Sequence, residues 1–212
     1  MSMKNFFYPL IENPYRNKDI LEAIKILKSK KLTIGPKTDE FQKYFSKKMK
    51  SKFSLMVNSG SSANLLALQC LINPYRKKRL KPGDEVLIPS LCWSTSLWPI
   101  IQSGLKPKFV DIDLETLNIN LNDLKKKISK KTKAILIVHV LGNCVDMTEL
   151  MQIVKRHKLI LIEDTCESLG TKFKNKYLGT FGDFSSFSFY TSHQISSGEG
   201  GMICCKTNED HE

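Results

Sequence analysis

The chain has 212 residues, of which 41% are hydrophobic and 25% are charged, proportions typical of a globular protein that can bury a core. The formal net charge of +12 comes mostly from lysine, but no aromatic residues interleave with the lysine run at 125–133 and no nucleic-acid motif occurs. We therefore interpret that run as a solvated helix end and loop, and we expect no nucleic-acid partner.

The six cysteines are scattered without C-x-x-C spacing, so the sequence indicates neither a zinc site nor a disulfide framework. Reduced thiols are the rule in the cytosol. The first ten residues hold too short an apolar run for a signal peptide, and Pro9 interrupts that run. Because no stretch reaches transmembrane length, we expect a cytoplasmic protein with no membrane partner.

The N-terminal part of the sequence predicts two helices. Asn17 can cap the first, which carries Ile20, Ile24 and Leu27 on one face. Gly35-Pro36 is expected to end it, and a second helix with an aromatic face follows. We divide the chain accordingly into an N-terminal helical segment, 1–35, and one large domain, 36–212.

Seven apolar runs then alternate with helical patterns, as in an α/β protein with a mostly parallel sheet. The expected strands are 53–57, 85–88, 107–112, 134–138, 159–162, 183–189 and 202–205. Between the fourth and fifth, Asp146 has the position of a helix N-cap. A ligand site is expected at the carboxyl ends of the strands.

Several residues at predicted strand ends could carry chemistry, although each has a plainer interpretation. The small residues of 58–62 could bind a phosphate through helix N-terminal amides, or could form only a turn. Asp164 could pair with a pyridinium nitrogen, or it could be a helix N-cap or a loop carboxylate. Trp93 could stack on a cofactor ring, but a place in the core is favoured for an isolated tryptophan. His139 is best interpreted as a structural histidine.

Taken together, the order and spacing of these segments resemble the DegT/DnrJ/EryC1/StrS family of sugar aminotransferases over essentially the whole chain. The segments that carry the resemblance are 58–62, 88–93, 110–113, 138–142, 162–164 and 188–201. The resemblance implies the large domain of a type I pyridoxal-phosphate (PLP) enzyme, similar to aspartate aminotransferase. Family members are nearly twice as long, so it also implies that a small C-terminal domain is missing and that this large domain is incomplete after Glu212.

The resemblance assigns cofactor-binding roles position by position. Gly60 and Ser61 would hold the phosphate, with Ser188 as a further donor. Trp93 would stack on the pyridine ring, and Asp164 would pair with its nitrogen. Glu167 stands where the family often has a glutamine near the ring hydroxyl, so its charge is a departure from the pattern.

The main departure is His193, which occupies the position of the lysine that bonds covalently to the cofactor. Histidine at this position resembles the sugar 3-dehydrase branch of the family, which uses noncovalently held pyridoxamine phosphate (PMP). The implied reaction is loss of the C3 hydroxyl from a nucleotide-linked 4-keto-6-deoxy sugar, in dideoxysugar or lipopolysaccharide O-antigen biosynthesis, with His193 as the base. Two alternatives stay open: a sugar aminotransferase using another lysine such as Lys206, and a non-catalytic fragment that only binds PLP or a nucleotide sugar.

The resemblance also bears on metals and partners. Cys166 lies where CDP-linked members of that branch place one ligand of a [2Fe-2S] cluster, and the other ligands would lie beyond Glu212. A structural buried thiol is an equal alternative, and Cys204 and Cys205 should point to opposite faces of their strand. The implied partners are a second copy, in a homodimer with a shared active site, and a reductase.

Overall fold

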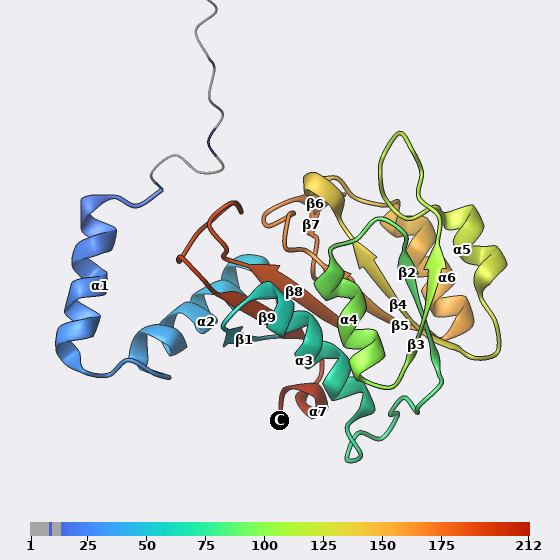
Figure 1. Ribbon diagram of the computed structural model, residues 1–212, viewed down its shortest axis with the longest axis horizontal. Coiled ribbons are helices and arrows are strands. Elements are labelled where there is room, and N and C mark those ends of the chain that lie inside the picture. Colours follow the sequence, from blue (N-terminus) through green and yellow to red (C-terminus); the bar gives the residue numbers. More distant parts are fainter. Residues whose placement is uncertain (1–8, 10–13) are drawn as a thin grey trace, which may run out of the picture.

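The computed structural model describes Pro9 and residues 14–212 (Figure 1). It confirms the predicted α/β architecture with a seven-stranded, mostly parallel sheet. The inference that the first ten residues are no signal peptide lies, apart from Pro9, outside the described residues. In the described part of the chain, no helix combines the length and the apolar character needed to cross a membrane.

The sheet has the strand order β1-β9-β8-β5-β4-β2-β3. Only β9 runs against its neighbours: it pairs antiparallel with both β1 and β8, whereas all the other pairs are parallel. The strands are β1 (Phe53–Val57), β2 (Glu85–Pro89), β3 (Lys106–Val110), β4 (Thr132–Val138), β5 (Ile160–Asp164), β8 (Phe184–Ser188) and β9 (Gly201–Cys205).

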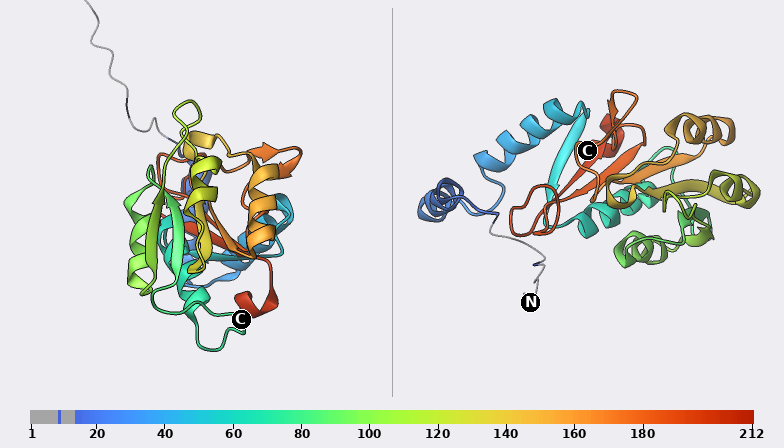
Figure 2. Two further views of the ribbon diagram at one scale, coloured as in Figure 1. Left: turned by 90° about the vertical axis from the view of Figure 1, so that its right-hand side faces the viewer. Right: turned by 90° about the horizontal axis from the view of Figure 1, so that it is seen from above.

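Helices cover both faces of this sheet (Figure 2). On one face lie α3 (Gly60–Ile72) and α4 (Ser94–Gln102), and on the other lie α2 (Pro36–Met49), α5 (Leu121–Lys127) and α6 (Met147–His157). The remaining elements are α1 (Asn17–Ser29), η1 (Val140–Gly142), α7 (Asn208–His211) and a small ribbon of β6 (Lys172–Phe173) and β7 (Lys176–Tyr177).

The side chains of each strand alternate between the two faces, as the two-residue period requires. In β2, Val86 and Ile88 pack with α3 and α4, whereas Leu87 packs with α5 and α6. In β9, Cys205 and Cys204 belong to the cores on opposite faces, which confirms the expectation for this pair. Burial on both faces explains the continuous apolar runs within β2 and β4.

The N-terminal helix differs from its prediction in two details. Its N-cap is Arg16, not Asn17, because the Asp19 carboxylate accepts a hydrogen bond from the Arg16 amide at 3.0 Å and fixes the start there. Its end comes at Lys30, in the left-handed region at φ 58°. Gly35 and Pro36 instead begin α2, as its N-cap and first residue. The helix α1 buries none of its residues, and the division at residue 35 stays a prediction.

Candidate functional site

A cavity of about 590 Å³ lies at the carboxyl ends of the parallel strands, where an open α/β sheet places its ligands. The segments that follow β1, β2, β4, β5 and β8 all reach it. Every residue predicted for the site lines this cavity: Gly60, Ser61, Trp93, Asp164, Glu167, Ser188 and His193, and also Cys166. The structure thus brings them together, while the individual roles remain predictions.

The floor of the cavity at one end is the N-terminus of α3. The Ser59 hydroxyl caps this helix by accepting from the Ser62 amide at 3.1 Å, and the amides of Gly60 and Ser61 donate no hydrogen bond to the described residues. Free amides at a helix N-terminus, together with the helix dipole, attract anions. The Ser188 hydroxyl, at the end of β8, lines the same end of the cavity.

Close packing at this helix end requires glycine. A Cβ on Gly60 would lie 2.6 Å from the Cys166 Sγ and 2.8 Å from the Ser188 Cβ. A Cβ on Gly201, the first residue of β9, would lie 2.3 Å from the Ser59 carbonyl carbon. The α3 N-terminus can therefore approach β8 and β9 only because these two residues lack side chains.

Asp164 ends β5 and projects a buried carboxylate into the cavity. Its Oδ2 accepts from Asn64 Nδ2 at 2.7 Å and from Ser96 Oγ at 2.8 Å, and its Oδ1 accepts from the Cys166 amide at 3.2 Å. All three donors are neutral. The alternative that Asp164 is a plain helix N-cap is wrong, since no helix starts after it.

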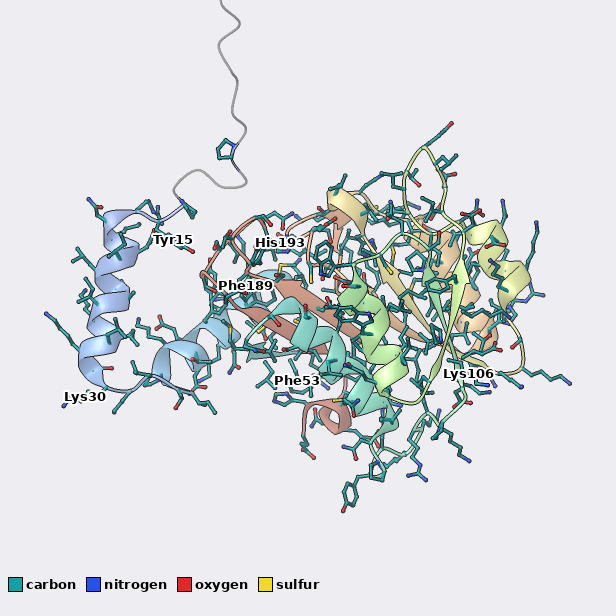
Figure 3. The ribbon with its side chains drawn as sticks, in the orientation of Figure 1. Tyr15, Lys30, Phe53, Lys106, Phe189 and His193 are labelled. Atoms are coloured by element: carbon teal, nitrogen blue, oxygen red, sulfur yellow. The ribbon has the colours of Figure 1, made fainter. Side chains whose placement is uncertain are left out.

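Trp93 and His193 complete the rim of the cavity. Trp93 is the N-cap of α4 and is 74% exposed, so the interpretation as a core residue is wrong, and its indole face is free to cover a ring. His193 lies in the loop between β8 and β9, with its ring edge-on to Tyr190 at 6.1 Å between centroids. Figure 3 places His193 at the edge of the sheet opposite to Phe53 and Lys106, which begin β1 and β3.

Glu167 and Cys166 follow β5 on the same side. The Glu167 carboxylate accepts from the Leu141 amide at 2.7 Å, which ties it to η1. Burial raises the pKa of the Cys166 thiol well above its usual value, and the Asp164 charge adds to this effect, so Cys166 stays a thiol. Within the described ranges, no group of three or more His, Cys, Asp or Glu residues is arranged to hold a metal ion.

His139 is a fully buried residue that does not line the cavity, and only one of its ring nitrogens has a hydrogen-bond partner among the described residues. Its Nε2 lies 3.2 Å from Glu163 Oε2, while its Nδ1 has no partner among the described residues. Glu163 also accepts from the amides of Gly179, Phe181 and Gly182. Burial raises the pKa of Glu163, but the His139 imidazole and the loop amides outweigh burial and hold that pKa below its usual value.

Asn64 and Ser96 were not predicted as site residues. Asn64 is a polar residue on the buried face of α3, one helical turn after Gly60. A polar residue on an otherwise nonpolar helix face is the one signal in the sequence that could have identified it. Ser96 is fully buried in the first turn of α4 and carried no signal in the sequence.

The cavity contains no lysine from the described part of the chain. Lys206, the lysine considered for covalent attachment, follows β9, and its Nζ donates to the Phe181 carbonyl. Because β9 is antiparallel, this position lies at the opposite edge of the sheet. Lys206 therefore cannot take the role that the aminotransferase alternative gave it.

The sheet order, the glycine-dependent helix N-terminus and the carboxylate at the end of β5 together define a PLP-type aminotransferase fold, and the residues predicted to bind the cofactor line one cavity. Residues 14–212 match the DegT/DnrJ/EryC1/StrS aminotransferase family. The chain belongs to this family, and the resemblance drawn from its sequence is confirmed.

Similar proteins include several sugar-modifying enzymes. The GDP-4-keto-6-deoxy-D-mannose 3-dehydratase of Escherichia coli O55:H7 is 42% identical over 202 residues, which is 95% of this chain and 52% of that protein. The lipopolysaccharide biosynthesis protein RfbH of Salmonella typhimurium is 43% identical over 84% of this chain and 41% of its own length.

A solved structure of an E. coli GDP-4-keto-6-deoxy-D-mannose-3-dehydratase with bound hydrated PLP superposes with a TM-score of 0.92 at 41% identity. The superposition covers 97% of this chain and 52% of that structure. The chain thus spans about half the length of the curated relatives it matches.

Proposed function

We propose that this chain carries the cofactor-binding part of a PMP/PLP-dependent sugar 3-dehydratase. The substrate would be a nucleotide-linked 4-keto-6-deoxy sugar, and the reaction would serve dideoxysugar or lipopolysaccharide O-antigen biosynthesis. One observation supports this choice most: the cavity presents His193 and no described lysine, while the other predicted cofactor residues surround it.

The residues present fit a phosphorylated pyridine cofactor. The amides of Gly60 and Ser61 at the α3 N-terminus would bind the phosphate, with the Ser188 hydroxyl beside them. Trp93 would cover one face of the ring, and the Asp164 carboxylate would hold the ring nitrogen in its protonated form. Without a lysine, these contacts have to retain the cofactor by noncovalent binding.

His193 is the base in this proposal. When bound, PMP supplies an amine for condensation with the sugar ketone and a ring that accepts electron density. The imidazole would accept the proton that leaves carbon in that process and could return it to the departing C3 hydroxyl. An imidazole suits this because it ordinarily exchanges protons between pH 5 and 8.

The aminotransferase alternative remains consistent with the family, because the family that residues 14–212 match is described as an aminotransferase family. It needs a lysine in the cavity, and the described residues supply none. The non-catalytic alternative predicts cofactor binding without turnover.

Partners and additional cofactors belong to the same proposal. The substrate makes a nucleotide sugar the first partner, and we propose a homodimer with a shared active site and a reductase that consumes the product. An iron–sulfur cluster would need ligands besides Cys166 from outside the described residues. A cytoplasmic location would suit these substrates.

The test is His193→Asn, assayed on the longest natural polypeptide that contains these residues. We expect dehydration of the nucleotide-linked 4-keto-6-deoxy sugar to fall by about 10²- to 10⁴-fold, the usual contribution of a general base, while PMP still binds. Binding is followed by ultraviolet–visible titration, and turnover by mass spectrometry of the 3-deoxy product.

His193→Lys is the matched control, because it should restore covalent attachment of PLP, visible by mass spectrometry after borohydride reduction, and abolish dehydration. Retained dehydration in His193→Asn would refute the role of His193. A wild-type protein that transfers an amino group instead would establish the aminotransferase alternative.

A further inference from the structure

The Asp164 carboxylate is held by two neutral side chains that the proposed function does not yet use. Asn64 comes from α3 and Ser96 from α4, and both donate to the same oxygen, Oδ2, at 2.7 and 2.8 Å. These three residues lie far apart in the sequence and meet only in the fold. All three are buried, Asn64 being 1% and Ser96 0% exposed.

The two donors leave the other oxygen available. A carboxylate can accept about four hydrogen bonds, and within the described residues Oδ1 accepts from the neighbouring Cys166 amide at 3.2 Å. No described lysine, arginine or histidine forms an ion pair with Asp164. No described ion pair therefore competes with a ligand for the Asp164 carboxylate, and Asn64 and Ser96 fix its orientation.

The amide of Asn64 is oriented by this contact. An ionised carboxylate only accepts hydrogen bonds, so the Asn64 nitrogen must face it. The Oδ1 of Asn64 is then left without a partner among the described residues, although Asn64 lies on the cavity wall. A buried amide with one unsatisfied atom contributes little to stability, which points to a role at the cavity rather than in the core.

We infer that Asn64 and Ser96 are positioning residues that keep the ring-nitrogen proton of the bound cofactor on the nitrogen. This inference rests on the proposed function. Hydrogen bonds to the charged form of a carboxylate make it a weaker base. With both donors present, a proton shared between Asp164 and a pyridine nitrogen stays on the nitrogen. With one donor removed, it shifts toward the carboxylate, and the ring becomes a poorer electron acceptor.

The experiment uses PMP labelled with ¹⁵N in the ring and bound to the wild-type protein, to Asn64→Leu and to Ser96→Ala. We expect the ¹⁵N chemical shift to report a protonated nitrogen in the wild type and to move toward the unprotonated value in both variants. The Kd for PMP should rise by about tenfold in each, as for the loss of one hydrogen bond to a charged group. Ser96→Thr keeps a hydroxyl and should retain the wild-type shift.

The matched control is Gln69→Leu, another amide-to-leucine change in α3, whose side chain donates to Ser103 Oγ instead. It should leave the ¹⁵N shift unchanged. Circular dichroism monitors folding of each variant, and if Asn64→Leu does not fold, Ser96→Ala decides alone. Wild-type binding of PMP with an unchanged ¹⁵N shift in the folded variants overturns this inference only. Failure of the wild type to bind PMP overturns the proposed function and this inference with it.

Discussion

Glu163 and Asp164 are adjacent in sequence, but they face opposite sides of β5 and have different hydrogen-bond partners. Asp164 points into the cavity, whereas Glu163 points away from it and accepts from three amides of the segment 179–182 and from His139. The alternation of a strand separates the two carboxylates. One is available to a ligand, and the other connects β5 to the segment that leads into β8.

The buried Glu163 predicts a particular dependence of stability on pH. Because its pKa in the folded chain lies below the ordinary value of 4.5, its ionised form stabilises the fold above that value. This contribution is lost as the pH falls through the lower folded pKa. We expect Glu163→Gln to lower the free energy of unfolding at pH 7 by about 1–3 kcal/mol and to lessen the loss of stability upon acidification.

Urea denaturation of the wild type and of Glu163→Gln at several pH values between 3 and 7 measures both effects. Glu85→Gln is a suitable control, because Glu85 also has a lowered pKa but its side chain is only partly buried. Identical pH profiles for the wild type and Glu163→Gln would contradict the assignment.

Helix ends show which parts of the structure the sequence could predict. Asp146 caps α6 as expected, with its Oδ1 accepting from the Thr148 and Glu149 amides at 2.8 and 3.2 Å. The start of α1 was misplaced by one residue, because Asn17 has the better capping side chain and only the Asp19 contact decides for Arg16. These two cases show that a helix N-cap can be predicted from sequence when one residue is the clear candidate, and that the prediction fails when two neighbouring residues can both be the N-cap.

Contacts between elements that are far apart in the sequence could not be predicted from local sequence patterns. The strands and the α/β class could be predicted from apolar runs, and the cofactor residues from a family resemblance. Asn64 and Asp164 are separated by 100 positions, so nothing local signals their hydrogen bond. The ribbon of β6 and β7 was also missed, because strands of two residues are too short to show a period.

Removal of the Asp146 cap from α6 should measurably lower the stability of the protein. Asp146→Ala removes the acceptor for both amides and should lower the free energy of unfolding by about 1 kcal/mol. Asp146→Asn keeps an acceptor and should cost only a fraction of that. Chemical denaturation of the three proteins measures the difference, and equal stability of Asp146→Ala and the wild type would show that the cap contributes nothing.

For the molecule as a whole, positive charge is concentrated at the edge of the sheet opposite to the cavity. A second hollow there is bordered by basic residues that form no ion pair with described residues: Lys78, Arg79, Lys81, Lys133, Lys155, Lys158 and Lys206. Its two acidic residues, Asp84 and Asp183, accept hydrogen bonds from backbone amides. Repulsion between these cations opposes folding.

Salt should therefore stabilise this protein. We expect the Tm to rise between about 10 and 150 mM NaCl, as the Debye length falls from about 30 to 8 Å. The double variant Lys133→Gln, Lys158→Gln should show a smaller rise, because it removes two of the repelling charges. Differential scanning fluorimetry measures both, and a Tm that falls with salt would show that attractive ion pairs dominate instead.

The antiparallel direction of β9 has a consequence for how this fold can change. The segment 189–200 leaves β8 and returns into β9 as a hairpin, and its two ends are joined by hydrogen bonds from Phe189 N to Gly200 O at 2.9 Å and from Ser197 N to Phe189 O at 3.0 Å. His193 sits inside this closed loop, so its identity is not constrained by the sheet. A different residue at position 193 therefore requires no change in the packing of the core, so under the proposed function the catalytic group can be exchanged independently of the fold.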